Sequence, residues 1–204
     1  KLRVAGSEQK PRVEGAISGT IGAITLDVSA EHQDNAWNGR MASLHYAPMR
    51  GPSWTLSHAA TFRYDGKNAI HLQSTCMHSD SASICADADW PRSANLQAHA
   101  LPLNLLDAWI TRPDLDLRAY GTVDAEAHLA PAAHGWSGTA QLHSSEGGLH
   151  LQPELAKPLF GYTNLAARAT LDGERLQLRL DSGLIAGGTV KAQIATGLAT
   201  DAPL

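Results

Sequence analysis

Leu115-Asp-Leu-Arg-Ala-Tyr-Gly-Thr-Val-Asp-Ala-Glu-Ala-His-Leu129 is the stretch that decides the fold class of this 204-residue chain. Its odd positions carry Leu, Ala, Gly and Val, whereas its even positions carry mostly charged or polar side chains. A period of two places the apolar residues on one face of a β-strand and the polar residues on the other. At about 3.3 Å per residue the run would reach roughly 50 Å, unless it bends at Gly121. The segment therefore predicts a strand far longer than the usual length of about five or six residues.

A second alternating unit runs from Asn164 to Gln193. Asp172-Gly173 predicts a hairpin turn within it, because a tight turn of this type needs residues that tolerate a positive φ. We expect Gly187-Gly188 to form a bulge before the last strand of the unit. The larger apolar residues of the unit are Leu165, Leu171, Leu176, Leu178, Leu180, Val190 and Ile194. Their spacing predicts that they share one face of the sheet.

The rest of the chain predicts further strands and one short helix. The strands are expected at residues 13–28, 37–46, 53–64, 68–75, 83–89, 95–100, 136–144 and 148–152, with Asp65-Gly66 as another hairpin turn. The helix is expected at residues 102–110, where Pro102 suits a first turn and Pro113 prevents extension. The pattern predicts an all-β protein: a long, curved antiparallel sheet that forms an open apolar groove, described as a β-taco or an incomplete barrel.

The composition favours a thin sheet over a thick globular core. Aromatic residues make up only 5% of the chain, so few bulky side chains are available to fill a core. We expect one continuous β-groove over residues 1–204, with a weak break near 146–158, where Gly147-Gly148, Pro153 and Pro158 gather. The abrupt termini are typical of a piece of a longer protein, so we expect any targeting segment or membrane anchor to lie outside it.

Charge and hydropathy exclude several classes of function. The formal net charge is −4 and no cluster of Lys and Arg stands out, which argues against nucleic acid as a partner. The chain has no apolar run of membrane-spanning length and no signal peptide.

Cys76 and Cys85 are the only cysteines, and they flank a polar, Ser-rich tip between two predicted strands. Opposed strands at such a tip would bring the two Cα atoms within disulfide range. We therefore expect a disulfide, which would indicate an oxidising compartment. The alternatives are two half-buried thiols in facing strands or a metal pair, although the spacing is not that of a zinc site.

The sequence offers no convincing catalytic or metal-binding motif. Ser7 and Lys10 have the S-x-x-K spacing of some acyl-transfer enzymes, but no supporting element accompanies them, and we attribute the match to chance. Four of the ten histidines, His32, His45, His58 and His71, are thirteen residues apart. No H-x-H or H-E-x-x-H motif is present, so we interpret them as scattered strand and surface residues. We predict that the chain is not an enzyme and uses no cofactor and no metal.

The segment from Ile70 to Trp136 resembles the TamB family, within the AsmA-like superfamily of Gram-negative bacteria. The resemblance is carried, in order along the chain, by a cysteine loop, a strand ending in Trp, a Leu-Pro-Leu helix and a Gly-Thr strand. The residues are Leu72, Cys76, Ile84-Cys85, Trp90, Leu101-Pro-Leu-Asn-Leu-Leu106, Trp109, Leu115-Asp-Leu117 and Gly121-Thr-Val-Asp-Ala125.

The resemblance implies a periplasmic segment of a protein anchored in the inner membrane, with the anchor outside this chain. Members of the family are thought to carry phospholipid along an apolar β-groove between the two membranes. The resemblance also implies a link to TamA, an outer-membrane barrel, in the assembly of outer-membrane proteins. It gives no catalytic residue to carry over to this chain.

We therefore expect a lipid-conducting groove, in which phospholipid acyl chains contact apolar side chains of the alternating strands. The groove candidates are Leu115, Leu117, Val123, Leu129, Leu165, Leu171, Leu176, Leu178, Leu180, Val190 and Ile194. One alternative is a chaperone or scaffold that pairs its sheet edge with strands of nascent outer-membrane proteins, without binding lipid. Another alternative is a secreted carbohydrate-binding β-protein, in which the five tryptophans, Trp37, Trp54, Trp90, Trp109 and Trp136, would stack on sugars.

Overall fold

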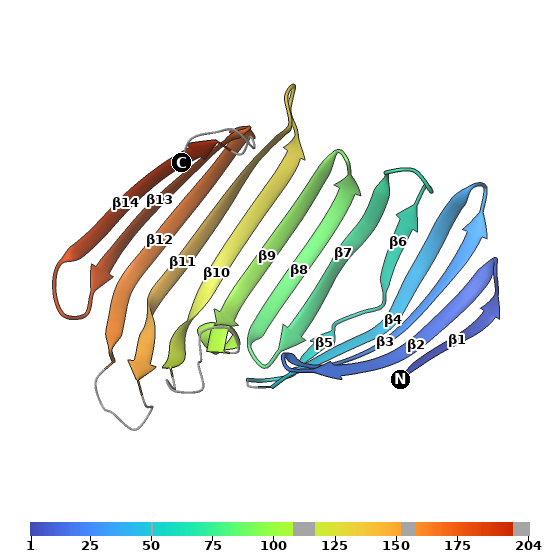
Figure 1. Ribbon diagram of the computed structural model, residues 1–204, viewed down its shortest axis with the longest axis horizontal. Coiled ribbons are helices and arrows are strands. Elements are labelled where there is room, and N and C mark those ends of the chain that lie inside the picture. The colour runs from blue at the N-terminus through green and yellow to red at the C-terminus, as the bar shows by residue number, and fades with distance from the viewer. Residues whose placement is uncertain (50, 108–116, 152–157, 198–204) are drawn as a thin grey trace. The chain divides into compact units, whose positions relative to one another are not determined.

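The computed structural model describes residues 1–49, 51–107, 117–151 and 158–197, and in these ranges the chain is almost entirely β-strand (Figure 1). The strands are β1 (Leu2–Ser7), β2 (Lys10–Gly19), β3 (Gly22–Gln33), β4 (Ala36–Pro48), β5 (Trp54–Leu56), β6 (Ala60–Tyr64), β7 (Ile70–Ser79), β8 (Ala82–Trp90), β9 (Ser93–Pro102), β10 (Leu117–Pro131), β11 (Trp136–Leu151), β12 (Phe160–Gly173), β13 (Arg175–Leu184) and β14 (Thr189–Gly197). One short 3₁₀-helix, η1 (Leu103–Leu106), follows β9.

The strands form one antiparallel sheet of 14 strands, in which neighbours along the chain are neighbours in the sheet. The exception is the pair β5 and β6, which share the space between β4 and β7 as two parts of an interrupted strand. The sheet is open, because β1 and β14 each pair with only one described strand. The predicted all-β class and the single antiparallel sheet are confirmed.

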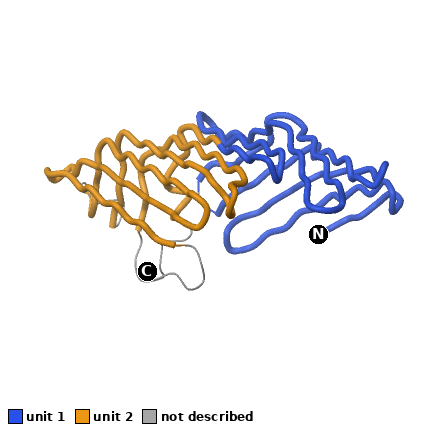
Figure 2. The backbone as a smooth tube through the Cα atoms, turned by 90° about the horizontal axis from the view of Figure 1, so that it is seen from above, with its two compact units in different colours: residues 1–96 blue, residues 97–204 orange. Residues whose placement is uncertain are grey.

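Two compact units divide the chain, residues 1–96 and residues 97–204, and Figure 2 distinguishes them by colour. The first unit contains β1 to β8 and the start of β9. The second contains the rest of β9, the helix η1 and β10 to β14. The stretch 146–158 lies within the second unit, where residues 146–151 belong to β11.

Several predicted boundaries were wrong because turns and bulges were misplaced. Residues 13–28 are two strands, since the chain turns at Thr20-Ile21 and Gly22 adopts a φ of +136°. Residues 53–64 contain two short strands, β5 and β6, rather than one. Ser57 lies between these strands, and its backbone N–H donates a hydrogen bond to the Cys76 carbonyl at 2.8 Å. Conversely, residues 136–144 and 148–151 form one strand, β11, because a bulge lets the strand continue through its glycines. The strand β1 was not predicted.

Turn chemistry explains two further differences. Gly187-Gly188 is the turn between β13 and β14 and not a bulge: both residues have positive φ, and Gly187 N–H donates to the Leu184 carbonyl at 2.9 Å. The turn at Asp172-Gly173 is present, but Asp172 pairs with Arg175, so the central residues are Gly173 and Glu174.

Of the predicted helix at 102–110, the described residues show the four-residue η1, and residues 108–110 lie outside the described part of the chain. It is followed by Asp107, a buried carboxylate that accepts a hydrogen bond from the Ala119 backbone N–H at 2.8 Å. This bond fixes the end of the helix to the beginning of β10.

The long strands of the second unit are interrupted at one common level. The register shifts between Gly121 and Asp124 in the β10–β11 pair, and between Thr163 and Ala166 in the β12–β13 pair. The extra residue lies on β11 in the first pair and on β12 in the second. Gly121, which flanks the first irregularity, has a φ of +102°, and Asn164, within the second, has a φ of +52°. The irregularity falls where the sequence predicted that the long strand could bend.

Candidate functional site: two apolar faces

The apolar face of the second unit is built from rows of side chains that run across the strands. Residues that are directly opposite in an antiparallel pair point to the same face, so the register defines each row. The first row is Leu129, Gly138, Leu171, Leu176 and Thr196. The second is Ala127, Ala140, Ala169, Leu178 and Ile194, and the third is Ala125, Leu142, Ala167, Leu180 and Ala192. These rows are here called the unit-2 apolar face.

The opposite face of the same strands is polar and charged. One of its rows is Glu126, Gln141, Arg168, Arg179 and Gln193, and the next is Asp124, His143, Ala166, Asp181 and Lys191. Asp124 accepts hydrogen bonds from the Ala100 backbone N–H at 2.9 Å and from His99 Nδ1 at 2.8 Å. The first of these bonds is the main reason that the pKa of Asp124 lies below its usual range. The two faces therefore differ sharply in polarity.

The unit-2 apolar face is not covered by other described parts of the chain. Leu165, Leu171, Leu176, Leu178 and Leu180 are each only half-buried, although they lie on the apolar face. At the last strand the exposure rises further, to 56% for Ile194 and 39% for Val190. The buried apolar residues of the described part of the chain include none from these three rows. A row of aliphatic side chains that remains accessible in this way is typical of a surface that receives an apolar partner.

A small closed patch lies beside this open surface, at the level of the bulges. The Ser144 hydroxyl donates to the Thr122 carbonyl at 2.6 Å and lies 2.8 Å from the Tyr162 hydroxyl. Ser144, Tyr162 and Val123 are all buried. The Tyr162 ring passes over Gly147, where a Cβ atom would be 2.7 Å from the ring carbon Cζ. Apart from the glycines beside it, no motif in the sequence points to the Ser144–Tyr162 pair.

The first unit repeats the same division of faces. One apolar row is Val4, Val13, Val28, Met41 and Ala60, and the next is Ala30, Gly39, Phe62, Leu72 and Ala88. Phe62 lies over Gly39, which leaves no room for a Cβ atom. A glycine opposite an aromatic ring is a known means of filling a sheet face. These rows, with the aromatic row described next, are called the unit-1 apolar face.

Aromatic side chains gather at one end of the unit-1 apolar face. The register aligns His32, Trp37, Tyr64, Ile70 and Trp90 in one row across five strands. The rings of His32 and Trp37 lie 4.9 Å apart. Trp54 lies elsewhere on this face, opposite Tyr46, and only 3% of its surface is exposed. The described tryptophans of this unit thus contribute to its apolar face.

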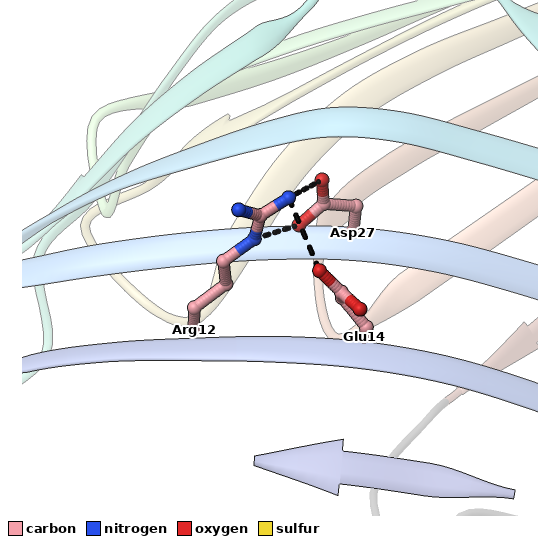
Figure 3. A network of polar contacts seen from close by, with 3 residues as sticks. All are labelled: Arg12, Glu14 and Asp27. Atoms are coloured by element: carbon pink, nitrogen blue, oxygen red, sulfur yellow. Dashed lines mark hydrogen bonds and ion pairs between the residues drawn. The ribbon is translucent and has the colours of Figure 1, made fainter. Parts of the chain in front are cut away.

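The charged face of the first unit carries a polar network between β2 and β3, shown in Figure 3. Arg12 donates to both carboxylate oxygens of Asp27, from Nε at 3.0 Å and from Nη2 at 2.7 Å. Its Nη2 atom also lies 3.2 Å from Glu14 Oε1. The hydrogen bond from Arg12 holds the pKa of Asp27 below its usual range, and the same bond raises the pKa of Arg12.

The disulfide is present, and it lies on the charged face. Cys76 and Cys85 are directly opposite in the β7–β8 pair, with their Cα atoms 4.0 Å apart. Cys85 lies between Ile84 and Ala86, whose side chains point to the apolar face, so the bridge points to the face of Asp87. The predicted disulfide is therefore confirmed, and it does not obstruct the apolar face.

The described residues contain no group of three or more His, Cys, Asp or Glu side chains that could hold a metal ion. His32 packs on Trp37, His45 Nδ1 lies 3.3 Å from Thr55 Oγ1, and His71 Nδ1 lies 3.7 Å from Asp89. In the parts of the chain that the structure describes, none of the helices is both long enough and apolar enough to span a membrane.

The structure brings most of the predicted groove residues onto one surface. Leu129, Leu171, Leu176, Leu178, Leu180 and Ile194 lie in the three rows of the unit-2 apolar face, and Val190 continues that face opposite Ser182. Val123 belongs to the closed patch. Only 5% of its surface is exposed, so it offers little surface to a ligand. Leu117 lies beyond the bulge, opposite Leu151, and Leu115 lies outside the described residues. The apolar face of the first unit was not among the predicted groove positions.

These features define a class: open antiparallel sheets with one uncovered apolar face and one charged face. The family model described as the TamB N-terminal domain matches residues 1–202, and the chain belongs to this family. Comparison with curated proteins found no match, and comparison with solved structures found none either. The family and the disulfide together fit an extracytoplasmic segment.

Proposed function

We propose that the apolar faces bind phospholipid acyl chains, in a periplasmic segment of a protein anchored in the inner membrane. In this proposal the whole protein carries phospholipid towards the outer membrane and supports the assembly of outer-membrane proteins. The TamB family is a family of transport and assembly proteins rather than enzymes. A partner of the TamA type would act through regions outside this chain.

The observation that carries the proposal is the uncovered state of the unit-2 apolar face. Its leucines remain half-exposed, and Ile194 is exposed, while the charged residues occupy the other face. Transfer of an acyl chain from water onto such a surface gains about 0.8 kcal/mol for each buried methylene. Binding of this kind requires apolar contact and no catalytic group.

The direction of the rows also suits an extended ligand. Neighbouring strands are about 4.8 Å apart, so a row across β10 to β14 spans roughly 19 Å. The row that contains Leu178 and Ile194 begins with three alanines on β10, β11 and β12. Small side chains leave space above the sheet, and the larger side chains of β13 and β14 form one wall of that space.

Site-specific photo-crosslinking in cells tests the proposal. A photoreactive residue at Leu178 or Ile194 should capture phospholipid. The matched controls are Arg179, which follows Leu178 in the sequence, and Gln193, which precedes Ile194. These two residues are opposite each other in the same strand pair, and both lie on the charged face. Lipid capture at the first pair and not at the second supports the proposal, whereas equal capture or none at either pair contradicts it.

A second function is favoured by the edges of the sheet. The strand β1 pairs only with β2, and β14 pairs only with β13, among the described strands. Leu2 and Val4 on β1 are each 65% exposed. A strand of a nascent outer-membrane protein could extend the sheet at such an edge by β-augmentation. Crosslinks from Val4 to protein clients, without lipid capture at Leu178, would favour this function over lipid transport.

A further inference from the structure

The charged face of the first unit contains a pocket of about 560 Å³, formed by five neighbouring strands from β2 to β7. Its size is within the range of sites that hold small ligands. Four cationic side chains line it, Lys10, Arg12, Arg40 and Arg63, with one carboxylate, Glu31. The lining is therefore strongly basic, in a chain whose net charge is −4.

The strand register places the cations around a floor of short side chains. Arg12 is opposite Ser29, and Ser29 is opposite Arg40, so Ser29 lies between two arginines in one row. In the next row Asn38 lies between Glu31 and Arg63. Short residues flanked by long ones produce a depression with arginine and lysine walls.

Two of the four cations are already neutralised by neighbouring carboxylates. Lys10 Nζ lies 2.7 Å from Glu31 Oε1, and Arg12 makes its two-pronged contact with Asp27 (Figure 3). Within the described residues, the side chains of Arg40 and Arg63 form neither a hydrogen bond nor an ion pair, and both residues are exposed.

Arg40 and Arg63 are diagonal neighbours on the pair β4–β6, since Arg40 is opposite Thr61 and Arg63 is opposite Asn38. Diagonal neighbours on one face lie within reach of the same ligand when their side chains are long. Guanidinium groups form paired hydrogen bonds with phosphate oxygens, and two of them can share one anion. The Asn38 side-chain amide, directly opposite Arg63, supplies a further donor.

We propose that this pocket binds a phosphate-bearing anion through Arg40 and Arg63. The ligand is either a soluble phosphate compound or the headgroup of an anionic phospholipid, since both present the same phosphate oxygens. The proposal concerns the charged face of the first unit and does not depend on lipid binding at the apolar faces.

The test measures binding to the whole 204-residue chain at low and at physiological salt. The probes are inorganic phosphate, glycerol 3-phosphate, and vesicles of phosphatidylcholine with and without phosphatidylglycerol. Binding of the soluble probes followed by NMR should shift the signals of Arg40 and Arg63. If only the vesicles that contain phosphatidylglycerol bind, and do so through these arginines, the ligand is a lipid headgroup. If the soluble probes bind and phosphatidylglycerol adds nothing, it is a soluble phosphate compound.

The double variant Arg40→Gln, Arg63→Gln should weaken binding roughly tenfold or more, because it removes both charge-assisted contacts. Both residues are exposed, so the fold should be retained, which the NMR spectrum checks. The matched control is Arg168→Gln, Arg179→Gln, which removes an equal charge from two exposed, opposed arginines on the charged face of the second unit.

The control should bind as the unmodified chain does. The proposal is overturned if no probe binds, or if the control loses as much affinity as the pocket variant, since that result would mean general charge attraction.

Discussion

Leu178 on β13 lies directly opposite Ile194 on β14, and both side chains remain accessible on the same face of the sheet. One residue further along, Arg179 lies opposite Gln193 on the other face. The same division holds across the sheet of the second unit, where each strand places aliphatic side chains on one face and charged or polar side chains on the other. Its consequence is that the two faces can be changed independently by mutation.

Leu178→Asp should abolish capture of lipid by a photoreactive residue at Ile194, because it places a charge on the surface that the acyl chains would contact. The fold should survive, since Leu178 is only half-buried. Gln177→Asp is the matched control, because Gln177 is adjacent but lies on the charged face, opposite Ala195. Loss of capture in the control as well would show that added charge alone, and not its face, is responsible.

Ser144→Ala should lower the free energy of unfolding by about 1–3 kcal/mol, since the Thr122 carbonyl and the Tyr162 hydroxyl would both lose their partner in a buried patch. Denaturant titration measures the change. Thr139 is an exposed residue on the charged face of the same strand, and Thr139→Ala should change the free energy of unfolding by less than about 0.5 kcal/mol. Equal, small effects in both variants would mean that the patch does not stabilise the bulged region.

Gly148→Ala should destabilise the second unit, because the new Cβ atom would collide with the Phe160 carbonyl oxygen and lie 2.8 Å from Gly161 Cα. The expected loss is about 1–3 kcal/mol, as for other overpacked sites. Gly19→Ala has no atom within 4 Å of the added Cβ and serves as the control. A Gly148→Ala protein as stable as the control would contradict the close approach of β11 and β12.

Replacing both Cys76 and Cys85 with Ala should cost roughly 2–3 kcal/mol on the chain-entropy estimate for a short loop. Hydrogen exchange should quicken mainly in β7 and β8, which the bridge joins. Lipid capture at Leu178 should not change, because the bridge lies on the charged face of the other unit. Unfolding of the whole chain on reduction would contradict this restricted role.

Arg12→Gln should raise the pKa of Asp27, which the hydrogen bond from Arg12 now holds below its usual range. A carboxylate with a lowered folded pKa contributes stability above its unfolded pKa of about 3.9, and that contribution is lost as the pH falls through the folded value. The contribution is small, because the pair is exposed to solvent. NMR titration of the Asp27 carboxyl group measures the shift, and an unchanged pKa in Arg12→Gln would contradict the assignment.

The alternation of side chains predicted the fold class, and it predicted that the larger apolar residues of the last strands share one face, because face assignment in a strand depends on residue parity. Leu176, Leu178 and Ile194 therefore fell on one surface as expected. The bulge between Gly121 and Asp124 could not be located by parity, and it separates Leu117 from the main rows and places Val123 in the closed patch. The pocket at Arg40 and Arg63 depends on which strands are neighbours, and the interrupted pair β5 and β6 obscured that pairing in the sequence.

The central claim is that acyl chains contact the unit-2 apolar face. The most direct measurement uses a phospholipid with a spin label on its acyl chain and records the broadening of methyl signals in the NMR spectrum. Leu176, Leu178 and Leu180 should broaden strongly, whereas the methyl groups of Thr170 and Ala195 on the charged face should not. Equal broadening on both faces, or no broadening at the three leucines, would contradict the claim.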